Sequence, residues 1–314
     1  MHLTPVDRLE IVVLMDNLAD NLLESSELVI RPPISNNGWI HTTPLVAEHG
    51  LSLLITLFAG EKKQTVLLDA AWNGVGLANN MKRLGISPEA IETIVLSHGH
   101  IDHCGGLSWL LDQISHSVSV VAHPDAFIAD RYLEWEGKFN LIAPDRQGVI
   151  DSGAQVIETK TPYISPDGLW GATGQIPRVT EFEKGLPNAY LERDGVKEVD
   201  QILDDQAIVI SLKNKGLVMI AGCAHSGIIN SIQYGQEITD LKSVFAVFGG
   251  FHLAGPTYEA VQDQTMAALR DIDPELIVPM HCTGFATIAR MSREFPDQHV
   301  TSCVGSKFIL GASE

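Results

Sequence analysis

The sequence predicts an α/β protein in which two β-sheets pack face to face and helices cover their outer sides. Short apolar runs alternate with turn residues and helical segments in the first half of the chain, and the same alternation returns after residue 206. Each half thus supplies several strands followed by helices, a pattern that suits two sheets around a shared core. With 314 residues, 45% of them hydrophobic, the chain is long enough to bury such a core.

The predicted elements follow this alternation along the chain. In the first half, strands are expected at 11–15, 51–58, 65–68 and 93–96, and helices at 76–84 and 106–114. In the second half, strands are expected at 207–212, 216–221, 243–248 and 276–279, and a helix at 257–270. From 136 to 200 the pattern of apolar runs weakens and Pro, Gly and charged residues increase. This indicates an elaborated loop region, which we expect beside the functional site described below. Since no linker or repeat divides the sequence, we expect a single domain over residues 1–314.

The composition argues against several classes of partner. A formal net charge of -18 repels the phosphate backbone of nucleic acids, so we expect no nucleic-acid partner. No stretch approaches the ~20 apolar residues that a membrane-spanning helix needs. The apolar run at 11–15 also lacks the basic flank of a signal peptide. We therefore expect a cytoplasmic protein without a membrane partner, and the sequence leaves the oligomeric state open.

The segment around residue 100 carries the strongest signal for chemistry. His98-Gly99-His100-Ile101-Asp102-His103 has the pattern HxHxDH, directly after an apolar strand and directly before a helix. Gly99 permits a turn that brings His98 and His100 toward a common point, while Asp102 and His103 start a second cluster. Imidazoles and a carboxylate suit zinc or iron. A histidine-rich surface turn is the alternative, but this pattern rarely arises by chance in a chain with 12 histidines.

Two later strands also end in candidate ligands. Cys223 and His225 follow the predicted strand at 216–221, and His281 follows the one at 276–279. Alone, each histidine would more often be an ordinary polar or core residue. Beside the HxHxDH segment, however, we expect His225 and His281 to converge on the same crevice as ligands.

The HxHxDH segment resembles the signature of the metallo-β-lactamase superfamily. The resemblance implies an αββα sandwich of two mixed β-sheets flanked by helices, with one or two metal ions at the sheet edge. It also implies that His98 and His100 hold the first ion and that Asp102 and His103 hold the second. Asp102 is expected to be catalytic as well, because a carboxylate at this place can orient the attacking water.

Six further segments occur in order between about residues 10 and 310. They are Ala47-Glu48-His49-Gly50-Leu51-Ser52, Thr173-Gly174-Gln175-Ile176-Pro177-Arg178, Asp205-Gln206-Ala207, Gly222-Cys223-Ala224-His225-Ser226-Gly227-Ile228-Ile229-Asn230, Gly249-Gly250-Phe251-His252-Leu253 and His281-Cys282-Thr283-Gly284. Together they resemble the branch labelled dihydropterin-methyl ribofuranosylaminobenzene phosphate synthase-like.

The chain departs from the hydrolytic members of the superfamily at one place. Those members carry an HTPGH-like segment where this chain has Asp204-Asp205-Gln206-Ala207, and Cys223 stands near the position of their bridging aspartate. We therefore expect His225 to replace the missing histidine in space. Asp205, Cys223 and His252 are further candidates to bind a second metal ion or the substrate.

These features predict a metal-dependent enzyme with one or two transition-metal ions, zinc as the first choice and iron or manganese as alternatives. The leading hypothesis is hydrolase-type chemistry, in which metal-activated water attacks a small anionic substrate that is phosphorylated or pterin-like. The branch resemblance implies instead a transferase that forms a dihydropterin-methyl aminobenzene ribofuranosyl phosphate. Alternatives of another class are a di-iron redox protein and a non-catalytic metal-binding protein.

Three residues are expected to bind the substrate. Arg178 carries a planar guanidinium that suits phosphate or carboxylate, and His49 and Thr283 are further candidates for the substrate wall. An internal salt bridge of Arg178 with Glu181 or Glu183 is the alternative.

Overall fold

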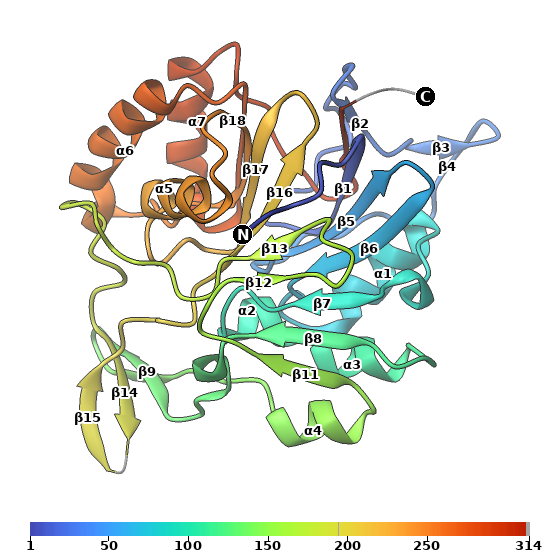
Figure 1. Ribbon diagram of the computed structural model, residues 1–314. Coiled ribbons are helices and arrows are strands. Elements are labelled where there is room, and N and C mark those ends of the chain that lie inside the picture. The colour runs from blue at the N-terminus through green and yellow to red at the C-terminus, as the bar shows by residue number, and fades with distance from the viewer. Residues whose placement is uncertain (194, 312–314) are drawn as a thin grey trace.

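Two large β-sheets form the centre of the protein, and helices lie on their outer sides (Figure 1). The computed structural model describes residues 1–193 and 195–311. One sheet has the strand order β11-β8-β7-β6-β5-β1-β20-β2, and the other has the order β12-β13-β16-β17-β18-β19. Both contain parallel and antiparallel pairs. The predicted αββα sandwich of two mixed sheets is therefore confirmed.

The eight-stranded sheet is built mainly from the first half of the chain. Its strands are β1 (Arg8–Met15), β2 (Val29–Ile30), β5 (Ser52–Ala59), β6 (Lys62–Leu68), β7 (Thr93–Val95), β8 (Ser119–Ala122), β11 (Gln155–Glu158) and β20 (Lys307–Gly311). The accompanying helices are α1 (Gly74–Leu84), α2 (Ile101–Cys104), α3 (Leu107–Asp112) and α4 (Arg146–Asp151). β20 pairs with β1, so segments near opposite ends of the chain meet inside this sheet.

The six-stranded sheet comes from the second half. Its strands are β12 (Tyr163–Ile164), β13 (Gly171–Ala172), β16 (Ala207–Leu212), β17 (Gly216–Ala221), β18 (Val244–Gly250) and β19 (Leu276–Met280). The accompanying helices are α5 (Ile228–Thr239), α6 (Glu259–Ile272) and α7 (Phe285–Glu294). Among the described residues, no helix is both long and apolar enough to cross a membrane.

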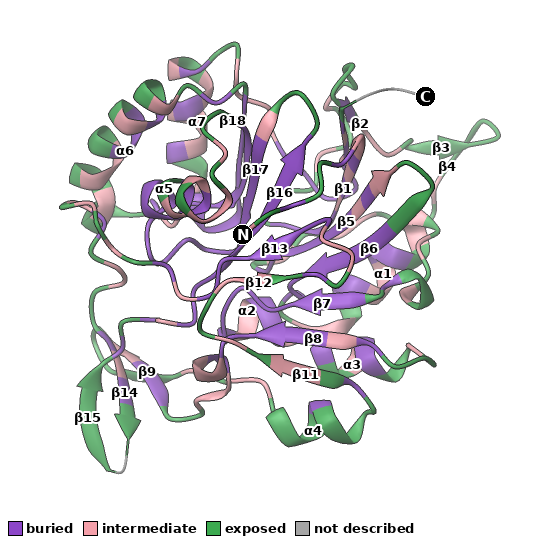
Figure 2. Cartoon of the chain, viewed as in Figure 1, coloured by how far each residue is buried: buried purple, intermediate pink, exposed green. Residues whose placement is uncertain are grey.

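Both sheets are buried on both faces, as the colouring of their central strands shows (Figure 2). On β16, Ile208 and Ile210 belong to the core between the sheets, whereas Val209 packs into a second cluster under α5 and α6. On β5, Ile55 lies in the shared core and Leu54 in a third cluster, which includes residues of α1 and α3. Successive residues of a strand point to opposite faces of the sheet. Because both faces are buried here, the central strands are near-continuous apolar runs.

The segment from 136 to 200 forms short strands as well as loops. β10 (Lys138–Asn140), β14 (Ala189–Arg193) and β15 (Val196–Val199) join β9 (Arg131–Glu134) in a small sheet at the side of the protein (Figure 1). β11, β12 and β13 extend the two large sheets. The sequence pattern is weak here because these strands are short and because every residue of β10 and β15 is exposed. Outside this segment, β3 (Ser35–Asn36) and β4 (Trp39–Ile40) form a separate hairpin.

Parallel pairing places the loops that follow the paired strands at the same end of each sheet. β6, β7 and β8 run parallel to one another, and so do β17, β18 and β19. The loops after β7, β17 and β19 all leave from carboxyl ends of these strands, where binding sites of α/β proteins are commonly built.

Candidate metal centre

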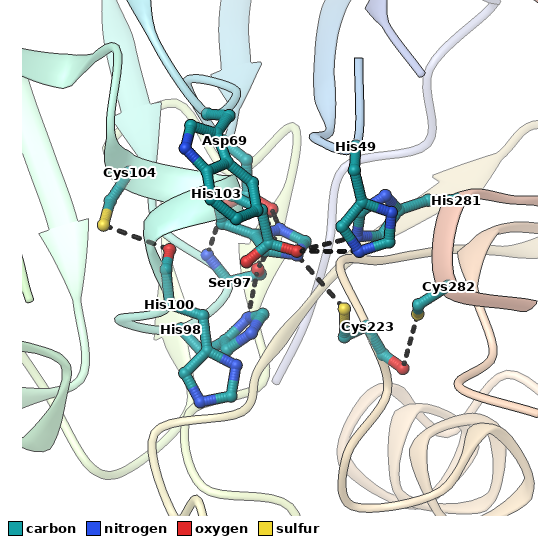
Figure 3. A network of polar contacts seen from close by, with 12 residues as sticks. His49, Asp69, Ser97, His98, His100, His103, Cys104, Cys223, His281 and Cys282 are labelled. Carbon is teal, nitrogen blue, oxygen red and sulfur yellow. Dashed lines mark hydrogen bonds and ion pairs between the residues drawn. The ribbon is translucent and has the colours of Figure 1, made fainter. Parts of the chain in front are cut away.

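The loops after β7, β17 and β19 bring the predicted ligands together. The first loop and α2 carry the HxHxDH residues, the second carries Cys223 and His225, and His281 follows β19 directly. In Figure 3, Cys223 and His281 approach the HxHxDH residues from the opposite side. Three overlapping groups of metal-ligating side chains result, each with its ligand atoms within 4.8 Å of one another.

Close backbone packing explains two glycines of this segment. A Cβ on Gly99 would lie 2.0 Å from the carbonyl oxygen of Ala126, and one on Gly105 would lie 1.9 Å from that of Trp72. No side chain fits at these distances. Gly99 is thus required for a close approach of two backbones and not for a left-handed backbone conformation.

His98, His100 and His225 form the first group, and all three are buried. Their ring centroids lie 4.5 to 4.9 Å apart. Nε2 of His98, Nε2 of His100 and both ring nitrogens of His225 are buried without a hydrogen-bond partner among the described residues. Burial lowers the pKa of all three imidazoles, that of His100 to about 4, so they are neutral at physiological pH. Buried polar atoms normally have partners. A transition-metal ion fits this group, because it binds neutral imidazole nitrogens.

Asp102, His103, Cys223 and His281 form the second group. Oδ2 of Asp102 lies 3.2 Å from Nε2 of His281 and 3.6 Å from Nε2 of His103. Sγ of Cys223 lies 3.1 Å from the same nitrogen of His103. Burial would raise the pKa of Asp102, but His103 and His281 hold it well below its usual range, so the carboxylate stays ionised. This mixture of carboxylate, imidazole and thiol donors suits zinc or iron.

Asp69 and Ser97 contact one histidine of each group, and no motif in the sequence indicated either residue. Oδ2 of Asp69 lies 2.6 Å from Nδ1 of His103, and its Oδ1 accepts the N–H of Ser97 at 2.7 Å. The Ser97 hydroxyl donates to Asp69 and lies 2.9 Å from Nδ1 of His98. Burial lowers the pKa of His103, but Asp102 and Asp69 raise it to about 9 overall. Asp69 and Ser97 therefore orient one histidine of each group.

Cys223 and His225 belong to a third group with His252. The His252 ring lies 4.3 Å from that of His225, and its Nδ1 is buried without a hydrogen-bond partner among the described residues. His252 has a φ of 47°, a left-handed conformation that is uncommon outside glycine. Both histidines line a cavity of about 260 Å³, together with Phe182, Glu183, Phe251 and Tyr258. His252 thus belongs both to a group of possible metal ligands and to the wall of this cavity.

His49 and Thr283 lie at different depths. Nε2 of His49 is 3.7 Å from Oδ2 of Asp102, and the side chain is 58% exposed, so His49 stands at the mouth of the site. The Asn17 side-chain amide holds its Nδ1 at 3.2 Å. Thr283 is fully buried, and its hydroxyl accepts the N–H of Phe251 at 2.9 Å.

Arg178 and Asp205 contact the loop that carries His225. The Arg178 guanidinium donates to the carbonyl oxygens of Gln201 and His225, and no ion pair with Glu181 or Glu183 is present among the described residues. Oδ2 of Asp205 accepts the N–H of Ser226 at 2.8 Å. In the described part of the chain, Asp205 belongs to none of the three groups. It faces the backbone of the loop instead.

Comparisons with known proteins agree with this geometry. Residues 47–235 match the model of a family described as the metallo-beta-lactamase superfamily. The 7,8-dihydropterin-6-methyl-4-(beta-D-ribofuranosyl)-aminobenzene-5'-phosphate synthase of Methanocaldococcus jannaschii is 29% identical over 82% of this chain and 88% of its own length. Uncharacterized protein MJ0448 of the same organism is 33% identical over 82% of this chain and 94% of its own.

A solved structure supports the fold along the whole chain. Tm1679, described as a metal-dependent hydrolase of the beta-lactamase superfamily, superposes with a TM-score of 0.72 at 24% identity, covering 98% of this chain and 100% of its own. A diphosphatase of the PhnP family gives a TM-score of 0.50 at 11% identity over 96% of this chain and 97% of its own. The family match, the relatives and the HxHxDH turn agree, and the chain belongs to the metallo-β-lactamase superfamily.

Proposed function

We propose that the protein is a hydrolase-type enzyme that acts on a small anionic substrate, phosphorylated or pterin-like, with one or two transition-metal ions and zinc as the first choice. The observation that carries the proposal is the set of buried imidazole nitrogens without partners in the first group. When bound, the metal ions would activate water for attack and stabilise the negative charge that develops on the substrate. His98, His100 and His225 would hold one ion, and Asp102, His103 and His281 would hold the other, with Cys223 as a further ligand.

Asp102 is the residue we assign to catalysis. Its carboxylate is ionised and 14% exposed, so it stays accessible to solvent although its Oδ2 contacts His281. An ionised carboxylate in this place can accept a hydrogen bond from water and orient the attacking oxygen. His49, which faces the same Oδ2 atom from the mouth, is suited to contact the substrate.

The cavity beside His225 and His252 supports a position for the substrate. Phe182, Phe251 and Leu253 give it apolar walls, and Glu183 and Lys184 come from the segment between 136 and 200. A flat organic ring would pack against these walls, while an anionic group would be drawn to the metal ions. Arg178 contacts the His225 carbonyl, and its Nε is buried without a partner among the described residues, which supports a role near the anion.

A transferase is the second candidate function, and two observations favour it. The relative from Methanocaldococcus jannaschii that is 29% identical is named as a synthase. A second cavity of about 340 Å³ lies beside His281 of the second group and is also lined by Asn17, Phe285 and His299. Two separate cavities, one lined by His225 and the other by His281, would allow two substrates to bind at once.

Assays with defined metal loading can separate these functions. Protein loaded with zinc, manganese or iron would be incubated with phosphoesters, lactones and pterin phosphates, first singly and then in pairs with an arylamine. A hydrolase converts a single substrate in water, whereas a transferase forms product only from a pair. Absence of turnover with every metal and every substrate would contradict both proposals.

A further inference from the structure

Asp204 and Asp205 are consecutive residues just before β16, and their side chains reach two different ligand-bearing loops. Oδ2 of Asp204 accepts the N–H of Gly99 at 2.8 Å, and Gly99 separates His98 from His100. Oδ2 of Asp205 accepts the N–H of Ser226, which follows His225, at 2.8 Å. Both carboxylates are buried, with 0% and 1% exposure. One pair of neighbouring acids therefore touches the backbone on both sides of the three-histidine group.

Buried arginine Arg131 compensates the charge of Asp204. Its Nη1 and Nη2 donate to the two carboxylate oxygens of Asp204 at 2.9 and 2.5 Å, and its Nε forms an ion pair with Asp200 at 3.0 Å. A bidentate contact of this kind fixes the orientation of a carboxylate and stabilises its negative charge. Arg131 belongs to β9 of the small sheet. Through Asp204, this sheet is therefore connected to the turn that carries His98 and His100.

Gln206, the next residue, is hydrogen-bonded to the residues that follow β7. Its backbone N–H donates to the carbonyl oxygen of Ser97 at 2.9 Å, and its side-chain amide donates to that of Leu96 at 2.8 Å. Asp204 and Gln206 are thus bound to the segment that follows β7, while Asp205 between them is bound to the loop of His225. β16 itself pairs with β17, which leads into the loop of His225.

Residues 204 to 206 contact both loops that carry the three histidines of the first group. His98 and His100 come from the eight-stranded sheet and His225 from the six-stranded sheet, so the spacing of the three imidazoles depends on how the two loops are held relative to each other. We propose that Asp204 and Asp205 are positioning residues that set this spacing through Gly99 and Ser226 while contributing no ligand atom. The inference rests on the proposed function, in that it requires a metal ion in the first group.

The consequence for the metal is a change of affinity without a change of ligands. Residues that orient metal ligands typically alter affinity by about 10-fold to 100-fold when replaced. Asp204→Asn keeps the shape of the side chain but weakens the contacts to Arg131 and to Gly99. Asp205→Asn weakens the contacts to His225 and Ser226 and breaks no close ion pair among the described residues, so it serves as the variant that is easier to fold.

Asp200→Asn is the matched control. Asp200 pairs with the same Arg131 and is buried, but its other contact is the N–H of Ile202 at 2.8 Å and not a ligand loop. Zinc affinity would be measured by competition with a chromogenic chelator, and the visible spectrum of the cobalt-substituted protein would report ligand geometry. Thermal unfolding of the metal-free proteins would report the structural cost of each change.

We expect Asp204→Asn and Asp205→Asn to weaken zinc binding by about 10-fold to 100-fold and to shift the cobalt spectrum. Asp200→Asn should lower only the thermal stability, leaving affinity and spectrum near those of the wild type. Wild-type affinity and spectrum in Asp205→Asn, or equal losses of affinity in Asp200→Asn and Asp204→Asn, would overturn the inference. A wild-type protein that binds no metal would instead overturn the proposed function.

Discussion

Oδ2 of Asp69 lies 2.6 Å from Nδ1 of His103, and neither side chain is exposed to solvent. When His103 binds a metal ion as a neutral imidazole, this contact keeps the remaining proton on Nδ1, because that hydrogen is shared with the carboxylate. Nε2 is then left to face Asp102 and Cys223. Asp69 is held in turn by two contacts with Ser97, so the ring of His103 has little freedom to rotate.

Asp69→Asn should weaken metal binding at the second group. An amide at this position loses the charge that stabilises the proton on Nδ1, and the ring of His103 is no longer held in one orientation. We expect metal affinity to fall by about 10-fold to 100-fold, measured by chelator competition. The exposed Asp112 provides the control Asp112→Asn. Unchanged affinity in Asp69→Asn would show that Asp69 does not position a metal ligand.

Replacing His98 and His100 together with alanine should remove at least one equivalent of metal. These residues supply two of the three imidazoles in the first group, and one histidine alone is a weak site. Elemental analysis of the purified protein measures the loss. His116→Ala is a suitable control, since that histidine is at the surface with 40% side-chain exposure. An unaltered metal content in the double variant would rule out the proposed ligands.

Asp102→Asn should nearly abolish turnover while the fold survives. The amide keeps the size of the side chain but is neither a good proton acceptor nor a charged metal ligand. We expect kcat/KM to fall by about 100-fold to 10,000-fold, with an unchanged circular dichroism spectrum. A well-folded variant that keeps most of its activity would exclude Asp102 from the catalytic step.

Glu183 should make the stability of the protein depend on pH. Its buried carboxyl group accepts the N–H groups of Ile229 and Asn230 at the start of α5, yet burial raises its pKa to about 7 from its usual 4.5. The folded state therefore holds this proton more tightly than the unfolded state. The resulting contribution is fully present below pH 4.5 and is lost as the pH rises through 7.

Glu183→Gln removes this titration. Between pH 4.5 and 8, we expect the free energy of unfolding of the wild type to fall by about 1 to 3 kcal/mol relative to the variant, measured by urea denaturation. Glu181→Gln, two residues away and exposed, should follow the wild type. Parallel pH profiles for the wild type and Glu183→Gln would contradict the prediction.

Arg178→Ala should discriminate between charged and neutral substrates. If the guanidinium acts on the anionic group near His225, its removal should lower kcat/KM for anionic substrates more than for neutral analogues. Kinetics on a matched pair of substrates measure the difference. Equal losses on both would mean that Arg178 acts only by holding the carbonyl groups of Gln201 and His225.

The sequence predicted the central strands well because they are buried on both faces. Strands such as β16 and β17 are continuous apolar runs, and their predicted bounds match the structure. Helix α5 was not predicted, because Ile228, Ile229, Asn230 and Ser231 are all buried and its first turn has no exposed face that would give an amphipathic pattern. The small sheet was missed for the opposite reason, since its outer strands bury nothing that would give a pattern.

At the site, motif spacing located the imidazoles but not the carboxylates that orient them. HxHxDH is a local pattern, whereas Asp69 is a single acid at the end of a strand, and only tertiary packing brings it to His103. For the same reason the sequence offered Asp205 as a metal or substrate ligand. Its side chain meets a backbone N–H of a loop 21 positions away in sequence, a contact that no local pattern reveals.

The pairing of β1 with β20 has a consequence for how the chain folds during synthesis. β20 is inserted between β1 and β2, so the eight-stranded sheet stays open along β1 until residues 307 to 311 have left the ribosome. Until then β1 presents unpaired N–H and C=O groups next to a row of apolar side chains, which is a template for pairing with other chains. Contacts across almost the whole sequence also slow folding, because a long loop must close before they form. We therefore expect deletion of residues 307 to 311, which leaves β1 unpaired on this side, to move the protein into the insoluble fraction.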